Sequence, residues 1–468
     1  MDFKDDIVAI STPTGMGAIA LIRITGDNAL MKVEPFFKSR SGTSISDIKS
    51  HSIIYGDFTY DDEIIDEVVL SYFAKGKSFT GQETVEISCH GSTYIQKTII
   101  EKLLTNNIRL AKAGEFTMRA FLNGKFDLTQ AEAVSDLIYS DSSSMHKIAL
   151  NQMRGGFQND LKVLREELLH FTSMIELELD FSEEDVEFAN KNDLLELIDR
   201  VKTKVAELKD SFKHGNAIKN GIPVAIAGKP NSGKSSLLNL LLNEEKAIVS
   251  NIAGTTRDAI EDTIIIDGIK YRFVDTAGLR KTDDEIESKG IEITKSKISK
   301  ASVLIYLFDI NDITNDEIVN DLFEFNRDDL TILLVRNKID LKNQSDIKME
   351  SLLKSCKNFH INEILEISAI QKDYLKPLKA KLLSVNKASE NNGTIVTNLR
   401  HYNSLNEAEL SLIDIKKGIE NGVTGDLLSI DLRKAIDSIG EITGQITNDE
   451  MLGNIFSNFC IGNLLIFI

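Results

Sequence analysis

The stretch GIPVAIAGKPNSGKSSLLNLLL, residues 221–242, decides the fold of the central part of this chain. Its residues 223–227 form a short apolar run typical of a buried parallel strand, and an apolar helix pattern follows the next loop. That loop, residues 228–235, spells G-x-x-x-x-G-K-S, whose glycines let backbone N–H groups converge on a phosphate at the start of a helix. The pattern predicts that Lys234 reaches the outer phosphates and that the hydroxyl of Ser235 binds Mg²⁺.

Four further motifs follow in the order and spacing of a guanine-nucleotide switch domain. They are GTTRD at residues 254–258, DTAG at 275–278, NKID at 337–340 and SA at 368–369. Thr256 is predicted to bind Mg²⁺ and Asp275 to hold it through water, while Gly278 is predicted to donate its N–H to the γ-phosphate. The carboxylate of Asp340 is predicted to accept from N1–H and the 2-amino group of guanine, a donor pair that adenine lacks.

Together these motifs predict a GTP hydrolase domain with a Ras-like P-loop fold. Asn337 and Lys338 are expected to pack and orient the loop that binds the base. The residues expected to bind GTP are Asn231, Ser232, Gly233, Lys234, Ser235, Ser236, Ser250, Gly254, Thr255, Thr256, Asp275, Thr276, Ala277, Gly278, Asn337, Lys338, Asp340, Ser368 and Ala369.

The residue after DTAG is Leu279, where many switch GTPases carry a glutamine that orients the attacking water. Leucine cannot orient water, so another group must do so, and a cation from elsewhere must stabilise the developing charge. The nearby cations are Arg257, Arg280 and Lys281, and the nearby acids are Asp283, Asp284, Glu285 and Glu287. Taken from the residues alone, these side chains are equally compatible with solvated surface charges.

The composition is that of a globular protein, with 42% hydrophobic and 27% charged residues, and 468 residues give room for about three domains. The net charge of −18 argues against a protein that holds nucleic acid alone through its phosphates. We expect a cytoplasmic protein without a signal peptide or membrane span, because no long apolar run occurs. The three cysteines match neither a disulfide framework nor a zinc pattern; they are Cys89, Cys356 and Cys460.

The first part of the chain, residues 1–120, has the pattern of an α+β domain. An amphipathic run predicts a helix at residues 93–104, and short apolar or alternating runs predict strands at residues 6–10, 18–24, 55–58, 67–73 and 85–91. Physical chemistry leaves two interpretations open, a binding site for an anionic ligand or a dimerisation module with surface charges. The side chains concerned are Arg23, Glu86, His90, Arg119 and Lys125.

Apolar residues recur at helical spacing on both sides of the GTPase motifs. The pair His214–Gly215 is expected to end the helix that precedes those motifs. The simplest architecture is one helical domain, residues 121–219 and 386–468, into which a GTPase domain at residues 220–385 is inserted. Helices are expected at residues 131–138, 161–179, 194–212, 403–420, 427–439 and 448–459.

Nearly the whole chain resembles the family of tRNA modification GTPases called MnmE or TrmE. Besides the GTPase motifs, the resemblance rests on SFTGQETVEISCHG at residues 78–91, GEFTMRAFLNGK at 114–125, DLTQAEAVSDLI at 127–138 and GEITGQITNDEMLGNIFSNFCIG at 440–462. It implies that residues 1–120 are a tetrahydrofolate-binding domain that makes a homodimer. The positions of Arg23, Glu86 and Lys125 match those at which the family binds a formyl- or methylene-tetrahydrofolate.

The resemblance also implies a reaction and a partner. The family works with a FAD-dependent subunit, MnmG or GidA, in a heterotetramer. Together they build an aminomethyl or carboxymethylaminomethyl group at C5 of the wobble uridine of certain tRNAs. The competing interpretation is a regulatory or ribosome-assembly GTPase that acts as a binding switch, because the GTPase motifs alone do not separate the two.

The family is activated by K⁺, and its GTPase domains pair across the nucleotide. K⁺ then provides the positive charge near the β- and γ-phosphates that an arginine finger provides elsewhere. Glu287 matches the acid that orients the attacking water through a second water. The residues that match the K⁺ ligands are Asn231, Ser250, Ile252 and Thr255, and the implied catalytic set is Asn231, Lys234, Gly278 and Glu287.

The chain departs from the family at its last residues. The family ends in Phe-Cys-Ile-Gly-Lys, whereas Gly462 is followed here by Asn463 and five apolar residues, 464–468. An altered reading of the last codons would explain the difference. The absent lysine belongs to the folate site in the family, so the change bears on folate affinity. Cys460 is either a small buried apolar residue or a thiol used in the modification chemistry.

Overall fold

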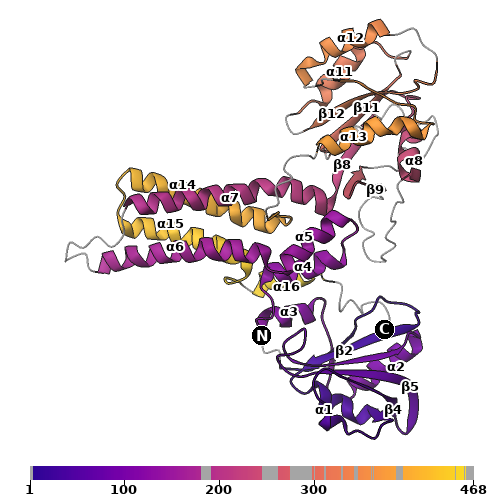
Figure 1. The fold of residues 1–468 in the computed structure, drawn as a ribbon, viewed down its shortest axis with the longest axis vertical. Helices are drawn as coiled ribbons and strands as arrows, with labels where there is room; N and C mark the ends of the chain where they lie inside the picture. Colours follow the sequence, from indigo (N-terminus) through magenta and orange to yellow (C-terminus); the bar gives the residue numbers. More distant parts are fainter. Residues whose placement is uncertain are drawn as a thin grey trace. The chain divides into compact units, whose positions relative to one another are not determined.

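The computed structural model describes residues 4–180, 191–244, 262–274, 298–299, 301–309, 312–327, 330–341, 346–359, 361, 363–385, 394–447, 449–457 and 459. The chain divides into two compact units. The first consists of Met1–Tyr139, Ala149–Lys202 and Ser404–Ile468, and the second of Ser140–Ile148 and Thr203–Asn403. Figure 1 shows one sheet in each unit. It also shows long helices from segments far apart in the sequence that lie side by side.

The N-terminal sheet has seven strands in the order β3-β4-β5-β6-β2-β1-β7. Neighbouring strands are antiparallel except β1 and β7, which are parallel. The helix predicted at residues 93–104 is confirmed as α2, and the five predicted strands correspond to β1, β2, β4, β5 and β6. The strands are β1 Ile7–Ile10, β2 Ile19–Gly26, β3 Phe37–Ser39, β4 Ser52–Tyr60, β5 Glu63–Phe73, β6 Glu83–His90 and β7 Arg109–Leu110, and the helices are α1 Ala29–Val33, α2 Thr93–Leu104 and α3 Glu115–Leu122.

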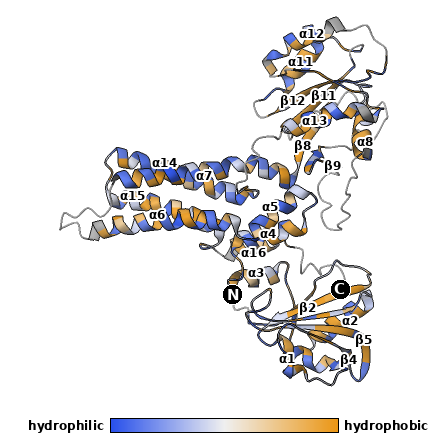
Figure 2. Cartoon of the chain, viewed as in Figure 1, coloured by the Kyte–Doolittle hydropathy of each residue, from blue (hydrophilic) through white to orange (hydrophobic). Residues whose placement is uncertain are grey.

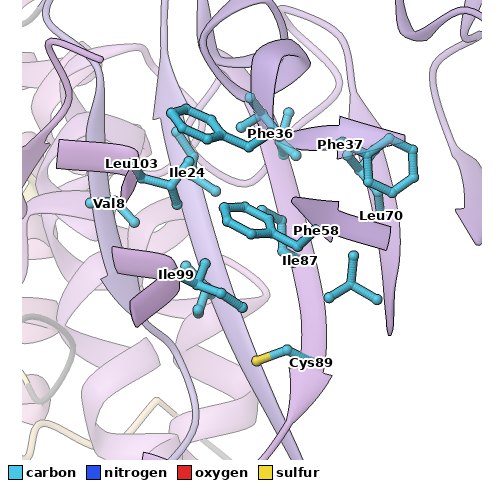
Figure 3. Packing of buried hydrophobic residues seen from close by; sticks show 14 of the residues in the cluster. Val8, Ile24, Phe36, Phe37, Phe58, Leu70, Ile87, Cys89, Ile99 and Leu103 are labelled. Atoms are coloured by element: carbon cyan, nitrogen blue, oxygen red, sulfur yellow. The ribbon is translucent and has the colours of Figure 1, made fainter. Parts of the chain in front are cut away.

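One face of this sheet carries the core of the N-terminal domain. Figure 3 shows Ile24 and Ile87 from the sheet packed with Ile99 and Leu103 of α2 and with the ring of Phe58. Successive side chains of a strand point to opposite faces. The residues between these core positions on β2 and β6 therefore point to the other face of the sheet, where the candidate ligand residues lie.

The helical part is built from both sides of the GTPase motifs, as predicted. Arg433 of α15 pairs with Glu176 of α6, and Lys416 Nζ of α14 lies 2.6 Å from Asp199 Oδ1 of α7. Figure 2 shows hydrophobic and hydrophilic residues alternating along α6, the pattern of a helix with one buried face. The helices are α4 Leu128–Ile138, α5 Ser143–Met153, α6 Gly156–Asp180, α7 Lys191–Asn220, α14 Leu399–Glu420, α15 Gly425–Thr443 and α16 Asp449–Ser457.

The prediction that His214–Gly215 ends a helix is wrong, because α7 continues to Asn220. The glycine is needed for close packing. A Cβ at Gly215 would lie 2.1 Å from the carbonyl oxygen of Val396, and the N–H of Val396 donates to Ser211 Oγ at 3.0 Å. The segment that precedes the GTPase domain thus lies beside the segment that follows it, as an inserted domain requires.

The second sheet has six strands in the order β13-β12-β11-β8-β10-β9. All neighbours are parallel except β9 and β10. Every residue of β11 is buried, as expected for a parallel strand covered on both faces. The elements are β8 Ile222–Ala227, β9 Asp262–Ile266, β10 Ile269–Phe273, β11 Val303–Phe308, β12 Thr331–Arg336, β13 Leu365–Glu366, α8 Lys234–Glu244, α11 Asn315–Phe325, α12 Asp346–Ser355 and α13 Lys376–Val385.

The predicted fold class is confirmed: an α+β N-terminal domain, a helical domain and a P-loop α/β domain. The helix α5 lies inside the predicted helical domain but was not predicted as a separate helix, because its sequence SSMHKIALNQM has no clear apolar stripe. Among the described helices, none combines the length and the apolar sequence that a bilayer crossing requires.

We predict that Gly215→Ala destabilises the protein, although alanine is the better helix former by about 1 kcal/mol. The added Cβ would overlap the carbonyl oxygen of Val396, and forcing a group into a packed site typically costs about 1–3 kcal/mol. The measurement is the urea midpoint followed by circular dichroism. Gly453→Ala in α16 is the matched control, because nothing in the described part of the chain lies within 4 Å of the Cβ that it adds. Equal midpoints for the two variants would contradict the close approach.

Candidate functional site

The phosphate-binding loop joins β8 to α8 and turns tightly at two glycines. Gly228 has a φ of 144°, and an added Cβ would lie 1.9 Å from the carbonyl oxygen of Leu307. Gly233 has a φ of 98°, and its Cβ would lie 2.2 Å from Nδ2 of Asn337. Asn231 adopts a left-handed φ of 60°, which asparagine tolerates better than most residues. Both positions therefore require glycine, because a side chain at either would overlap Leu307 or Asn337.

The ammonium group of Lys234 is held by the backbone of this loop. Its Nζ donates to the carbonyl oxygens of Gly228 at 2.9 Å and Lys229 at 2.8 Å. Lys234 is also the first residue of α8, where the helix dipole favours an anion. The half-buried Ser235 and the exposed Ser236 follow in the first turn of α8. A positive charge at the start of a helix suits a polyphosphate.

A buried amide, that of Asn337, joins the phosphate-binding loop to the two other loops of the site. Its Nδ2 donates to the carbonyl oxygen of Ser232 at 2.7 Å, and its Oδ1 accepts from the N–H of Ala369 at 2.8 Å. The residue is only 3% exposed. The three loops follow β8, β12 and β13, whose carboxyl ends meet at one edge of the parallel sheet, where such folds bind ligands.

The carboxylate of Asp340 is oriented by a buried serine. The Oγ of Ser368 donates to Asp340 Oδ1 at 2.7 Å. Lys338, with a φ of 64°, places its Nζ 3.1 Å from Oδ2 of Asp309. A carboxylate fixed in this way suits a ligand edge with two neighbouring donors, as guanine has.

The predicted switch residues and the C-terminal candidates lie outside the described residues. The structure describes the strands next to them: β9 begins at Asp262, and β10 ends at Phe273, two residues before the DTAG motif. The residues concerned are Ser250, Ile252, Gly254, Thr255, Thr256, Arg257, Asp275, Thr276, Ala277, Gly278, Leu279, Arg280, Lys281, Asp283, Asp284, Glu285, Glu287, Cys460 and Asn463.

Arg23 and Glu86 form an ion pair on the open face of the N-terminal sheet. They are register partners on β2 and β6, with Arg23 Nε 2.7 Å from Glu86 Oε1. The guanidinium lies 5.6 Å from the ring centre of Phe79 and 5.7 Å from that of Phe116, within range of a cation–π interaction. The two charged side chains remain 17% and 19% exposed. The two rings could not be predicted as site residues from the sequence, because an isolated phenylalanine is usually a core residue.

Lys125 belongs to neither β2 nor β6, but its segment reaches the ring of Phe79. Its exposed Nζ donates to the carbonyl oxygen of Gly76 at 2.9 Å. The next residue, Phe126, packs on Phe79 with ring centres 5.5 Å apart. Phe79 thus connects the segment of Lys125 to the guanidinium of Arg23.

Arg119, named above as a ligand candidate, belongs to the core of the N-terminal domain. It is fully buried, with its guanidinium 2.9 Å from Glu115 Oε1 and 2.7 Å from Asp5 Oδ1. Burial raises the pKa of Glu115, but hydrogen bonds from Arg109, the Lys112 backbone and Arg119 outweigh it and lower the pKa overall. A fully buried cation that is paired in this way is closed to a ligand.

His90 is fixed by a carboxylate. Its Nδ1 lies 2.7 Å from Asp66 Oδ1, and its backbone N–H donates to the other oxygen of Asp66 at 2.8 Å. The ring stays largely exposed at the end of β6. His90 therefore faces solvent at one end of the open sheet face.

Comparison with known proteins gives matches over the whole chain. The family described as "MnmE helical domain" matches residues 128–460, and "GTP-binding protein TrmE N-terminus" matches residues 6–125. A protein of Flavobacterium psychrophilum named tRNA modification GTPase MnmE is 52% identical over 99% of this chain and 100% of its own length. A protein of the same name from Cytophaga hutchinsonii is 49% identical over 98% of each chain.

One of the similar solved structures is that of Era from Aquifex aeolicus bound to GDP and AlF4⁻. It is 26% identical, covers 41% of this chain and 66% of its own, and has a TM-score of 0.26.

We predict that Ser232→Ala leaves nucleotide binding intact and keeps or raises thermal stability. The hydroxyl of Ser232 is buried and has no hydrogen-bond partner among the described residues. A buried unpaired polar group destabilises a protein by about 1–3 kcal/mol, and the loop offers a phosphate its backbone rather than this hydroxyl. Thermal midpoints and titration with a fluorescent GTP analogue provide the measurement. Asn337→Ala is the contrasting variant and should weaken binding. A clear loss of affinity for Ser232→Ala would show that its hydroxyl contacts the ligand.

Proposed function

This chain belongs to the MnmE family of tRNA modification GTPases, and we propose which reaction its GTP hydrolysis serves. As a family member it hydrolyses GTP and acts in tRNA modification. The proposed product is an aminomethyl or carboxymethylaminomethyl group at C5 of the wobble uridine. One observation carries the proposal. About half of the residues of this chain are identical to those of proteins named tRNA modification GTPase MnmE, over nearly their full length.

We assign the phosphates of GTP to the loop between β8 and α8. The loop turns tightly at Gly228 and Gly233 and leads into the start of α8, which favours an anion, and Lys234 supplies the neutralising charge. Ser235 and Thr256 are the proposed Mg²⁺ ligands. When bound, Mg²⁺ neutralises charge on the β- and γ-phosphates.

Guanine recognition is assigned to Asp340. Its carboxylate, held by Ser368, would accept from two donors of guanine, N1–H and the 2-amino group, a pair that adenine lacks. Lys338 and Ala369 belong to the same loops. This pattern of donors and acceptors supports GTP over ATP as the substrate.

We further propose that K⁺ supplies the positive charge that an arginine finger supplies in other GTPases. Asn231 is exposed in a left-handed turn of the phosphate-binding loop, so its amide oxygen is accessible to a cation. The other proposed ligands, Ser250, Ile252 and Thr255, lie outside the described residues. Glu287 is proposed to orient the attacking water, in keeping with the leucine after DTAG.

The one-carbon unit is proposed to come from a tetrahydrofolate bound on the open face of the N-terminal sheet. Glu86 offers a carboxylate to the donor edge of a pterin, and Arg23 and Phe79 offer a charged and an aromatic surface beside it. Lys125, exposed nearby, suits the anionic tail of a folate. In the family this site belongs to a homodimer and includes the C-terminal lysine. Asn463 stands in place of that lysine here, and Cys460 lies three residues before it in the sequence.

The flavin chemistry is assigned to a separate FAD-dependent subunit, MnmG, in a heterotetramer. That subunit is also proposed to supply most of the contacts to tRNA. A net charge of −18 on this chain disfavours binding to RNA phosphates, which supports this division of labour.

The proposal predicts that Arg23→Ala abolishes folate binding and wobble-uridine modification while leaving GTP hydrolysis unchanged. The variant is expressed in a bacterial strain that lacks its own copy of the gene, and modified nucleosides of total tRNA are quantified by mass spectrometry. Arg40→Ala is the matched control, because Arg40 is another arginine of this sheet region paired with carboxylates, those of Asp57 and Glu67.

Normal modification with Arg23→Ala would contradict the folate assignment. Restored ribosome profiles without any wobble modification by the native chain would instead support the assembly-switch alternative.

A further inference from the structure

The hairpin formed by β9 and β10 connects the two switch segments of the GTPase domain. The segment containing GTTRD, residues 254–258, leads into β9, and β10 ends just before DTAG. The turn between the strands is Asp267–Gly268, with φ values of 49° and 80° that suit a tight hairpin. β9 is the last strand of the sheet and pairs with β10 alone among the described strands. The hairpin is therefore joined through the chain to both switch segments, one at each strand.

The far end of the hairpin is attached to the start of α5. Lys270 Nζ on β10 lies 2.5 Å from Oδ2 of Asp141, and the two side chains are only 22% and 30% exposed. Ser142, the next residue, caps α5: its Oγ accepts from the N–H of Met145 at 3.2 Å. Gly268 at the tip packs closely on the same helix start, because a Cβ there would lie 2.9 Å from Ser143 Oγ.

The same lysine also contacts the point where the chain enters the GTPase domain. Gly221, between α7 and β8, has a φ of 80°, and a Cβ there would lie 3.1 Å from Lys270 Cγ. The aliphatic part of the Lys270 side chain thus packs against Gly221, while its ammonium group pairs with Asp141. We call Asp141, Gly221, Gly268 and Lys270 the hairpin clasp; all four belong to the second unit.

We propose that the hairpin clasp couples the GTP cycle to the helical domain, with Lys270 as its positioning residue. The hairpin receives the switch movement at one end and holds the capped start of α5 at the other. α5 continues without a break to Met153, beyond residue 148 where the segment of the second unit ends. An ion pair that is largely shielded from water transmits such a movement better than a solvated one, because the pair resists separation. This inference rests on the proposed function, in which GTP hydrolysis drives modification.

The test uses charge reversal at the clasp in the full-length chain. Lys270→Glu and Asp141→Lys are each expected to keep GTP hydrolysis close to the native rate. Each should lower wobble-uridine modification in complemented cells by about fivefold or more, the lower range of allosteric coupling. The combined variant, in which the two charges are exchanged, should restore modification, because the attraction is re-formed. If the pair served only folding, the single variants would lose hydrolysis as well as modification. Unchanged hydrolysis in the single variants, with modification restored in the double variant, therefore separates coupling from a structural role.

Matched controls come from a surface ion pair of the same unit, Lys381 with Glu363. Reversal of either charge there should leave both readouts unchanged. If the reversed clasp variants do not fold, Lys270→Gln and Asp141→Asn remove the attraction without adding a repulsion. Normal modification by these folded variants would overturn the proposal, as would parallel loss of hydrolysis and modification. Absence of wobble modification with the native chain would instead refute the proposed function itself.

Discussion

The nucleotide site depends on one buried side chain, the amide of Asn337. A buried amide must have both its donor and its acceptor satisfied. Here the donor is satisfied by the phosphate-binding loop at Ser232 and the acceptor by the base-binding loop at Ala369. Gly233 must be a glycine for the same reason, since its Cβ would occupy the place of that amide nitrogen. The loops proposed to bind the phosphates and the base are therefore parts of one hydrogen-bonded arrangement.

In the N-terminal domain, burial decides what a given charged residue can do. Arg119 and Arg23 are both arginines paired with a glutamate, at Glu115 and Glu86. Arg119 is fully enclosed, so its pairing stabilises the fold and excludes a ligand. Arg23 lies on the open face of the sheet beside Phe79, where its charge and an aromatic face remain within reach of a small molecule. The difference follows from position: strand alternation places Arg23 on the face of β2 opposite the main core, whereas Arg119 lies on helix α3, where Asp5, Gln82 and Glu115 pair with its guanidinium.

The fold was largely predictable from the sequence, whereas contacts between distant residues were not. Local patterns defined β8, α2 and the helices on either side of the GTPase domain, because apolar spacing and turn residues act over short distances. Gly215 was misread as a helix end because its close contact, Val396, is far away in the sequence. The helix α5 was missed because its position depends on a cap and on the hairpin rather than on an apolar stripe. The meeting of the GKS, NKID and SA motifs was predictable because their spacing in the sequence is typical of one nucleotide site. Their ligand contacts and the switch segments remain predictions.

The most direct test of the account is steady-state GTP hydrolysis by the purified chain in K⁺ and in Na⁺ at equal ionic strength. In the proposed mechanism, the catalytic positive charge comes from a K⁺ ion bound by Asn231 and by the segment 250–255 rather than from a protein group. This mechanism predicts strong stimulation by K⁺, which Asn231→Ala abolishes while nucleotide binding persists. Equal rates in the two salts would contradict it, and would place the catalytic charge on a side chain such as Arg257 or Arg280.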